Sequence, residues 1–176
     1  QSGKSHGIDI INAVEIEKVE LAEGVRAFYV DSTPADCARY GIIGLKEEYD
    51  LVISGINRGY NLGKDIVYSG TVGAVYEAAG LGFKCIALST APHSLELAVS
   101  MLDKVFDFFK EHDLFNKNII YNVNLPDCEP KGIKITRTGG GYYSDEFECV
   151  GDKMYLLGGR MIWNDKNDME LDTDAV

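Results

Sequence analysis

Residues 50–81 read DLVISGINRGYNLGKDIVYSGTVGAVYEAAGL, and they carry most of the information on structure and chemistry in this chain. A short apolar strand, Leu51 to Ile53, leads into a loop of glycines and asparagines that ends in Ser-Gly-Thr. A helix is predicted from about Gly70, because apolar residues recur at helical spacing from Val72 to Ala79. Small residues let the backbone approach a ligand, and the helix start offers free N–H groups. The stretch therefore predicts a site for a phosphate or an oxygen-bound metal.

The composition is that of a globular protein with a marked acidic excess. The 176 residues are 45% apolar and 26% charged, and 17 basic against 28 acidic residues give a net charge of −11. This charge argues against binding to a nucleic-acid duplex, and it means that a phosphate site must rely on local donors or a bound cation. No apolar run approaches the ~20 residues of a membrane span. The four cysteines lack CxxC spacing; we expect reduced thiols, with Cys37 and Cys85 buried, and a cytoplasmic protein.

Strands and helices alternate along the chain on both sides of the central stretch. A helix is expected from Thr33, its N-cap, to about Lys46. A longer helix is expected from Ser94 to about His112. The expected strands, which are rich in β-branched and aromatic residues, are Ile8–Ala13, Val25–Asp31, Leu51–Ser54, Lys84–Ser89 and Asn118–Asn124.

This alternation predicts an α/β fold, a Rossmann-like and mostly parallel sheet with helices on both faces. From Gly132 the pattern changes to short β runs separated by glycines, which predicts a β-hairpin arm. We therefore expect an α/β core over residues 1–131, and an arm with an acidic C-terminal segment over 132–176. The short β runs are Ile133–Arg137, Tyr142–Phe147 and Met154–Leu157.

The polar residues of the central loop each have a structural and a functional interpretation. Asn57, just past the end of a strand, can bind a cation or a phosphate, or it can stabilise its own turn. Ser69 can be an N-cap alone, or its hydroxyl and that of Thr71 can bind a phosphate together with the N–H groups of Gly70 and Thr71. The loop matches neither the P-loop pattern nor the dinucleotide fingerprint, so a redox enzyme using a dinucleotide is disfavoured.

The central stretch SGINRGYNLGKDIVYSGTVGAVYEAAGLG closely resembles the signature of the SurE family, the survival-protein nucleotidases. Three more segments agree in order: QSGKSH at the start, STPADC from Ser32, and YNVNLP followed by GIKITRTG. The second segment has Ser32 where the family has glycine. The resemblance covers nearly the whole chain.

The resemblance implies a phosphatase that uses one divalent cation per subunit, Mg²⁺ or Mn²⁺, and acts on nucleoside 5′- and 3′-monophosphates. By motif position, the metal ligands in this chain are Ser2 and Asn57. Phosphate contacts carry over to Asn61, Ser69, Gly70 and Thr71. The family's β-hairpin arm implies a homodimer or homotetramer.

One part of the family's pattern is not in this chain. The paired aspartates of the family motif are expected upstream of residue 1, so the chain alone is expected to be catalytically inactive. A different class of function therefore stays open: a non-catalytic domain that binds phosphate or a nucleotide and joins subunits through its arm.

Overall fold

The structure is a computed structural model that describes residues 5–140, 143–161 and 174. Two compact units are present. The first, which we call the α/β unit, comprises Gln1–Tyr60 and Val67–Pro130. The second, the arm unit, comprises Asn61–Ile66 and Lys131–Val176. The middle of the glycine loop thus belongs with the arm.

A three-stranded parallel sheet is the centre of the α/β unit. Its order is β3 (Val52–Arg58), β4 (Cys85–Thr90) and β5 (Ile120–Leu125). Every residue of β4 is buried, as expected for the central strand of a parallel sheet covered on both faces. The predicted α/β fold is confirmed, and β3 runs further toward the loop than the sequence indicated.

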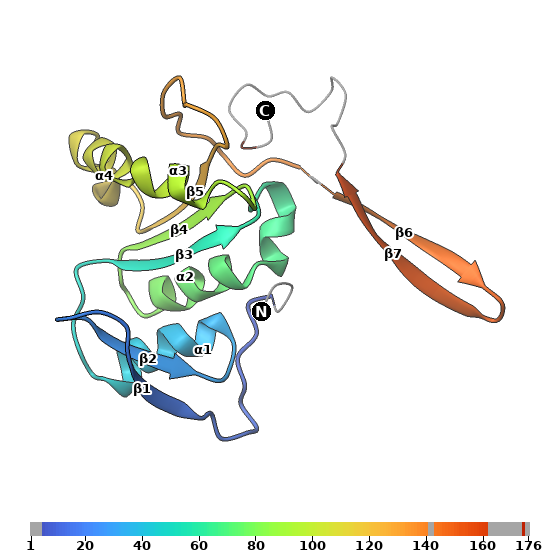
Figure 1. Ribbon diagram of the computed structural model, residues 1–176, viewed down its shortest axis with the longest axis horizontal. Helices are drawn as coiled ribbons and strands as arrows, with labels where there is room; N and C mark the ends of the chain where they lie inside the picture. The colour runs from blue at the N-terminus through green and yellow to red at the C-terminus, as the bar shows by residue number, and fades with distance from the viewer. Residues whose placement is uncertain (1–4, 141–142, 162–173, 175–176) are drawn as a thin grey trace. The chain divides into compact units, whose positions relative to one another are not determined.

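Helices cover both faces of this sheet (Figure 1). One face carries α2 (Gly70–Gly80), which begins where it was predicted. The other carries α3 (Leu95–Ser100) and α4 (Leu102–Glu111). The single helix expected over 94–112 was wrong in one respect. Met101 ends α3 by donating its N–H to the Ala98 carbonyl at 3.1 Å, and α4 starts after it.

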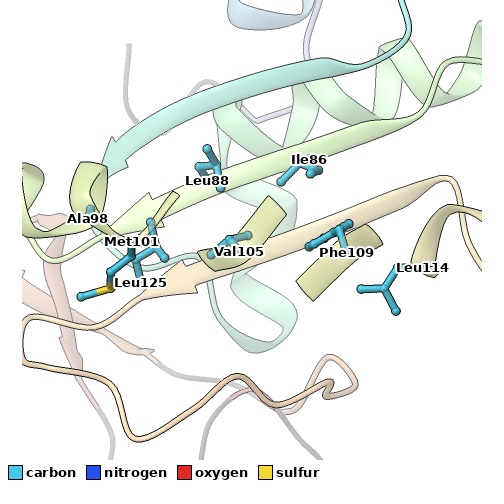
Figure 2. Packing of buried hydrophobic residues seen from close by; sticks show 8 residues of the cluster. All are labelled: Ile86, Leu88, Ala98, Met101, Val105, Phe109, Leu114 and Leu125. Carbon is cyan, nitrogen blue, oxygen red and sulfur yellow. The ribbon is translucent and has the colours of Figure 1, made fainter. Parts of the chain in front are cut away.

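The main core lies between the sheet and α4 (Figure 2). Val105 and Phe109 are four residues apart on α4, so they share a face, and both are buried against Ile86 and Leu88 of β4. Burial of each such side chain stabilises the fold by roughly 1.5–3 kcal/mol. The complete cluster is Ile86, Leu88, Ala98, Met101, Val105, Phe109, Leu114 and Leu125.

A β-hairpin and a short helix precede the sheet. The hairpin pairs β1 (Ile16–Glu20) with β2 (Arg26–Val30), and α1 (Pro34–Arg39) follows with Thr33 as its N-cap. The prediction of one helix to Lys46 was wrong, because a π-helical turn, Tyr40–Gly44, succeeds α1. That turn contains two glycines, which weaken an α-helix.

The strand expected over Ile8–Ala13 was also wrong. The Asp9 carboxylate accepts hydrogen bonds from the backbone N–H groups of Ile11 and Asn12, each at 2.9 Å. An aspartate that binds backbone two and three residues ahead forms a turn in place of an extended chain.

The arm unit contains the predicted hairpin. Its strands are β6 (Tyr143–Val150) and β7 (Lys153–Met161), which pair antiparallel across a tight turn at Gly151 and Asp152. Gly151 has φ +64°, which favours glycine. The stretch Ile133–Arg137, expected as a strand, forms none in the described part of the chain. From residue 162 onward, in the predicted acidic C-terminal segment, Asp174 alone is among the described residues.

Candidate functional site

Asn57 lies at the carboxyl end of β3, half-buried and in register with Ser89 of β4. Its Nδ2 donates to the Gly59 carbonyl oxygen at 2.8 Å, which is the turn-stabilising interaction considered from the sequence. Because this bond uses Nδ2, it does not involve the other polar atom of the amide, Oδ1. An amide oxygen is a ligand that hard cations accept, so the turn and the metal interpretations of Asn57 are compatible.

Gly55 gives the end of β3 its irregular course. Its φ is +129°, and a Cβ at this position would lie 2.3 Å from the Leu88 carbonyl oxygen of β4. The register of β3 against β4 shifts between Ser54 and Asn57. A glycine is therefore required for the chain to pass this close to β4 and deliver Asn57 at the sheet edge.

The start of α2 has the geometry of an anion-binding helix terminus. Ser69 is the N-cap, as predicted, and its Oγ accepts the Val72 N–H at 3.2 Å. The N–H groups of Gly70 and Thr71 precede the first bond of the helix ladder, so no intrahelical partner takes them. Together with the helix dipole, two such N–H groups favour a phosphate at this position.

The N-terminal segment reaches the same helix. The Ser5 N–H donates to the Tyr68 carbonyl oxygen at 3.1 Å, and the His6 ring stacks on Tyr76 with the centroids 5.1 Å apart. Gly73 makes this approach possible, since a Cβ there would lie 2.9 Å from the His6 Cα. The segment that follows the predicted serine loop thus lies against α2, whereas Ser2 itself is outside the described residues.

Asn61 belongs to the arm unit and is 8% exposed. Asn57, Ser69, Gly70 and Thr71 belong to the α/β unit. Near Asn61, the structure adds a residue to which the sequence gave no role. The Asp174 carboxylate accepts the backbone N–H groups of Gly63 and Gly139 at 3.0 and 2.7 Å. No local motif marks this contact, because Asp174 is 111 residues from Gly63.

Asp36 is a second carboxylate whose role is structural. Burial would raise the pKa of Asp36, but hydrogen bonds from the Ser32 hydroxyl, the Asp9 N–H and the Thr33 hydroxyl outweigh it, and the pKa is lowered. The three donors approach Oδ2 at 2.5, 2.9 and 3.0 Å. Asp36 thus joins the N-terminal segment to the start of α1 and is not free for proton transfer.

Other reactive groups of the α/β unit are placed for structure. Cys85 is buried as predicted, and burial raises the pKa of its thiol to about 11. Cys37 was predicted to be buried and is exposed. The Thr90 hydroxyl, at the end of β4, is fully buried and has no hydrogen-bond partner among the described residues. Such a group is a candidate for an ordered water.

Among the described residues, no group of three or more His, Cys, Asp or Glu side chains could hold a metal ion. None of the helices described there is long and apolar enough to cross a membrane.

Comparison with known proteins gives one consistent match. The family model described as Survival protein SurE matches residues 1–145. The 5′-nucleotidase SurE of Thermosipho melanesiensis is 37% identical over 186 aligned residues, which span all of this chain and 72% of that protein. The corresponding protein of Clostridium beijerinckii is 39% identical over 84% of this chain and 62% of its own length. The crystal structure of a SurE protein from Aquifex aeolicus superposes with a TM-score of 0.73 and 32% identity, covering 99% of this chain and 72% of that one.

Proposed function

The chain belongs to the SurE family, a family of nucleotidase-type enzymes, and on that premise we propose that it removes phosphate from nucleoside 5′- and 3′-monophosphates with a divalent cation. The observation that carries the proposal is the helix start at Ser69, which leaves two N–H groups for an anion in a chain whose relatives are named 5′-nucleotidases.

The phosphate is assigned to the start of α2 in the α/β unit, and the family resemblance carries a further phosphate contact to Asn61 of the arm unit. Gly70 and Thr71 would donate backbone N–H groups, and the Ser69 and Thr71 hydroxyls would contact the remaining oxygens. Such donors are already oriented before the reaction, so they stabilise the charge that builds on the non-bridging oxygens without reorganising. Asn61 would add an amide donor. This local arrangement is needed because the net charge of −11 repels anions at long range.

The cation, Mg²⁺ or Mn²⁺ at one per subunit, is assigned to Ser2 and Asn57, with the paired aspartates expected upstream of residue 1. The support from the described residues is that Asn57 bonds to the Gly59 carbonyl through Nδ2, which leaves Oδ1 to face a ligand. An amide oxygen is a ligand that suits a hard cation better than it suits zinc. A cation held there would supply polarisation of the phosphoryl oxygens and a lowered pKa of a bound water. Two neutral ligands hold such an ion weakly, so the aspartates would supply the charge.

The test uses this chain extended upstream with a strand that carries the paired aspartates. With Mn²⁺, we expect release of inorganic phosphate from nucleoside monophosphates, measured by a colorimetric phosphate assay. An extended protein that releases none would overturn the proposal.

Two substitutions of Asn57 sharpen the test. Asn57→Ala should raise the Mn²⁺ concentration for half-maximal activity by about tenfold or more, because it removes one oxygen ligand. Asn57→Asp keeps an oxygen at this position and should restore Mn²⁺ activation. Equal metal dependence in all three proteins would remove Asn57 from the metal site.

A second candidate function is a non-catalytic domain that binds phosphate or a nucleotide and joins subunits. It is favoured by the anion-binding geometry at the start of α2, where N–H groups can hold an anion by themselves. Two measurements separate the candidates: calorimetry of phosphate or nucleotide binding to the 176-residue chain, and the phosphate-release assay on the extended protein. Binding to the chain together with no phosphate release by the extended protein supports the second candidate.

The arm unit is proposed to join subunits into a homodimer or homotetramer. The support is the exposure of large apolar side chains on the hairpin, among them Phe147 and Met154, which a partner would cover.

Exposed thiols at Cys128 and Cys149 fit a reducing, cytoplasmic setting. The acidic surface is unsuited to a nucleic-acid duplex.

A further inference from the structure

Two backbone segments of the arm unit, one containing Gly63 and the other Arg137 and Gly139, meet at Asp174. Oδ2 accepts the Gly63 N–H at 3.0 Å, and Oδ1 accepts the Gly139 N–H at 2.7 Å. The N–H of Asp174 donates to the Arg137 carbonyl oxygen at 2.9 Å. One side chain thus fastens the loop that contains Asn61 to the chain segment before the hairpin.

The two fastened segments touch each other directly. The Lys64 N–H donates to the Gly140 carbonyl oxygen at 2.9 Å. Gly63 is buried with φ +55°, and a Cβ there would lie 1.9 Å from the same oxygen. No side chain fits between the two backbones, so the loop conformation at Gly63 depends on this contact.

A carboxylate suits this contact better than an amide does. Both oxygens accept from a backbone N–H, and only the ionised form offers acceptors on both sides without a proton of its own. An amide at this position would keep one acceptor and turn an N–H donor toward the other backbone N–H. Hydrogen bonds to an ionised acceptor are about twice as strong as neutral ones, so the isosteric amide should release one of the two segments.

From this arrangement we propose that Asp174 is a positioning residue for phosphate binding, which acts by holding the Asn61 loop against Gly139 and Gly140. The proposal rests on the proposed function, which assigns a phosphate contact to Asn61. Asn61 lies two residues before Gly63 and is buried, so the course of the loop determines where its amide points. A loop that is held only part of the time binds with an apparent affinity lowered by the fraction held.

The kinetic test compares Asp174→Asn and Asp174→Glu in the extended, Mn²⁺-loaded protein. Asp152→Asn is the matched control, since Asp152 is an exposed acid at the hairpin turn of the same unit. Asp174→Asn should raise KM for a nucleoside monophosphate, and the inhibition constant of inorganic phosphate, by about tenfold, with kcat within about twofold. Asp174→Glu, which keeps the charge, should recover part of this loss, and the control should match the wild type.

A second readout follows the contact itself in the 176-residue chain. Amide hydrogen exchange should accelerate at Gly63 and Gly139 in Asp174→Asn and stay unchanged in Asp152→Asn. Unchanged exchange would overturn the contact. An active wild type whose KM and phosphate inhibition do not respond to Asp174→Asn would overturn the positioning role alone. An inactive wild type would overturn the proposed function and the positioning role with it.

Discussion

At the scale of single residues, Asp36 contributes more to the fold than a charge near a helix dipole. Its Oδ2 accepts three hydrogen bonds while 8% of the residue is exposed. Thr33 caps α1 by accepting the Asp36 N–H at 3.1 Å and donates its own hydroxyl proton back to the carboxylate. This reciprocal bonding is a variant of the capping box, and it also secures Asp9 of the N-terminal segment.

Asp36 therefore predicts a pH-dependent stability. Because the folded-state pKa is lowered below the ordinary value of ~3.9, its stabilisation is fully present above that value and is lost as the pH falls through the folded pKa. Asp36→Asn should lower the free energy of unfolding by about 1–3 kcal/mol at pH 7, and the difference from wild type should shrink below pH 4. Urea unfolding at both pH values measures this. Asp127→Asn, at an exposed acid, is the control, and a pH-independent difference would contradict the prediction.

At the scale of elements, α2 gives up helix propensity at Gly73 in order to accept the N-terminal segment. Glycine inside a helix costs about 1 kcal/mol relative to alanine. The absence of a side chain lets the backbone of Ser5 and His6 pack against the helix. A Cβ at residue 73 would lie only 3.0 Å from the Ser5 carbonyl oxygen and 2.9 Å from the His6 Cα. Because these two atoms belong to the backbone, they cannot move aside as the end of a flexible side chain would.

Gly73→Ala should accordingly separate helix stability from docking of the segment. The free energy of unfolding should change little or rise by up to about 1 kcal/mol, while the Ser5 amide, bonded to Tyr68, loses protection from hydrogen exchange. In the extended protein, Mn²⁺ activation should weaken, since the proposed ligand Ser2 lies just before this segment. Gly80→Ala is the matched control in the same helix, because a Cβ there meets nothing within 4 Å. A Gly73→Ala protein with unchanged Ser5 protection would refute this account.

At the scale of the whole molecule, features that depend on residues near in sequence could be predicted, and features that depend on residues far apart in sequence could not. The parallel strands and the Ser69 cap are specified by neighbouring residues, and both were predicted. Ile8–Ala13 has the composition of a strand, but the side-chain bonds of Asp9 override it. The strand Ile16–Glu20 was missed because its two apolar residues, Ile16 and Val19, are three positions apart and so do not alternate with polar ones, and every position is exposed. The hydrogen bond between Asp174 and Gly63 joins residues 111 positions apart, and no sequence pattern in either segment predicts it.

The arm unit offers a prediction about assembly that depends on which face of the hairpin is apolar. Cys149 pairs with Met154 in the antiparallel ladder, and Phe147 is two residues from Cys149 on the same strand. Phe147 and Met154 therefore share one face, where they are 67% and 61% exposed. Val150 lies on the opposite face at 56% exposure.

If the arm joins subunits through the Phe147 face, the double variant Phe147→Ser, Met154→Ser should dissociate the oligomer. Each apolar side chain contributes roughly 1.5–3 kcal/mol when covered, and a two-fold interface counts each one twice, so the dissociation constant should rise at least about a hundredfold. Light scattering during size-exclusion chromatography reports the mass. Val150→Ser removes a comparable apolar group from the other face and should leave the mass unchanged. If Val150→Ser dissociates the protein equally, or if the double variant keeps its mass, the arm does not associate through this face.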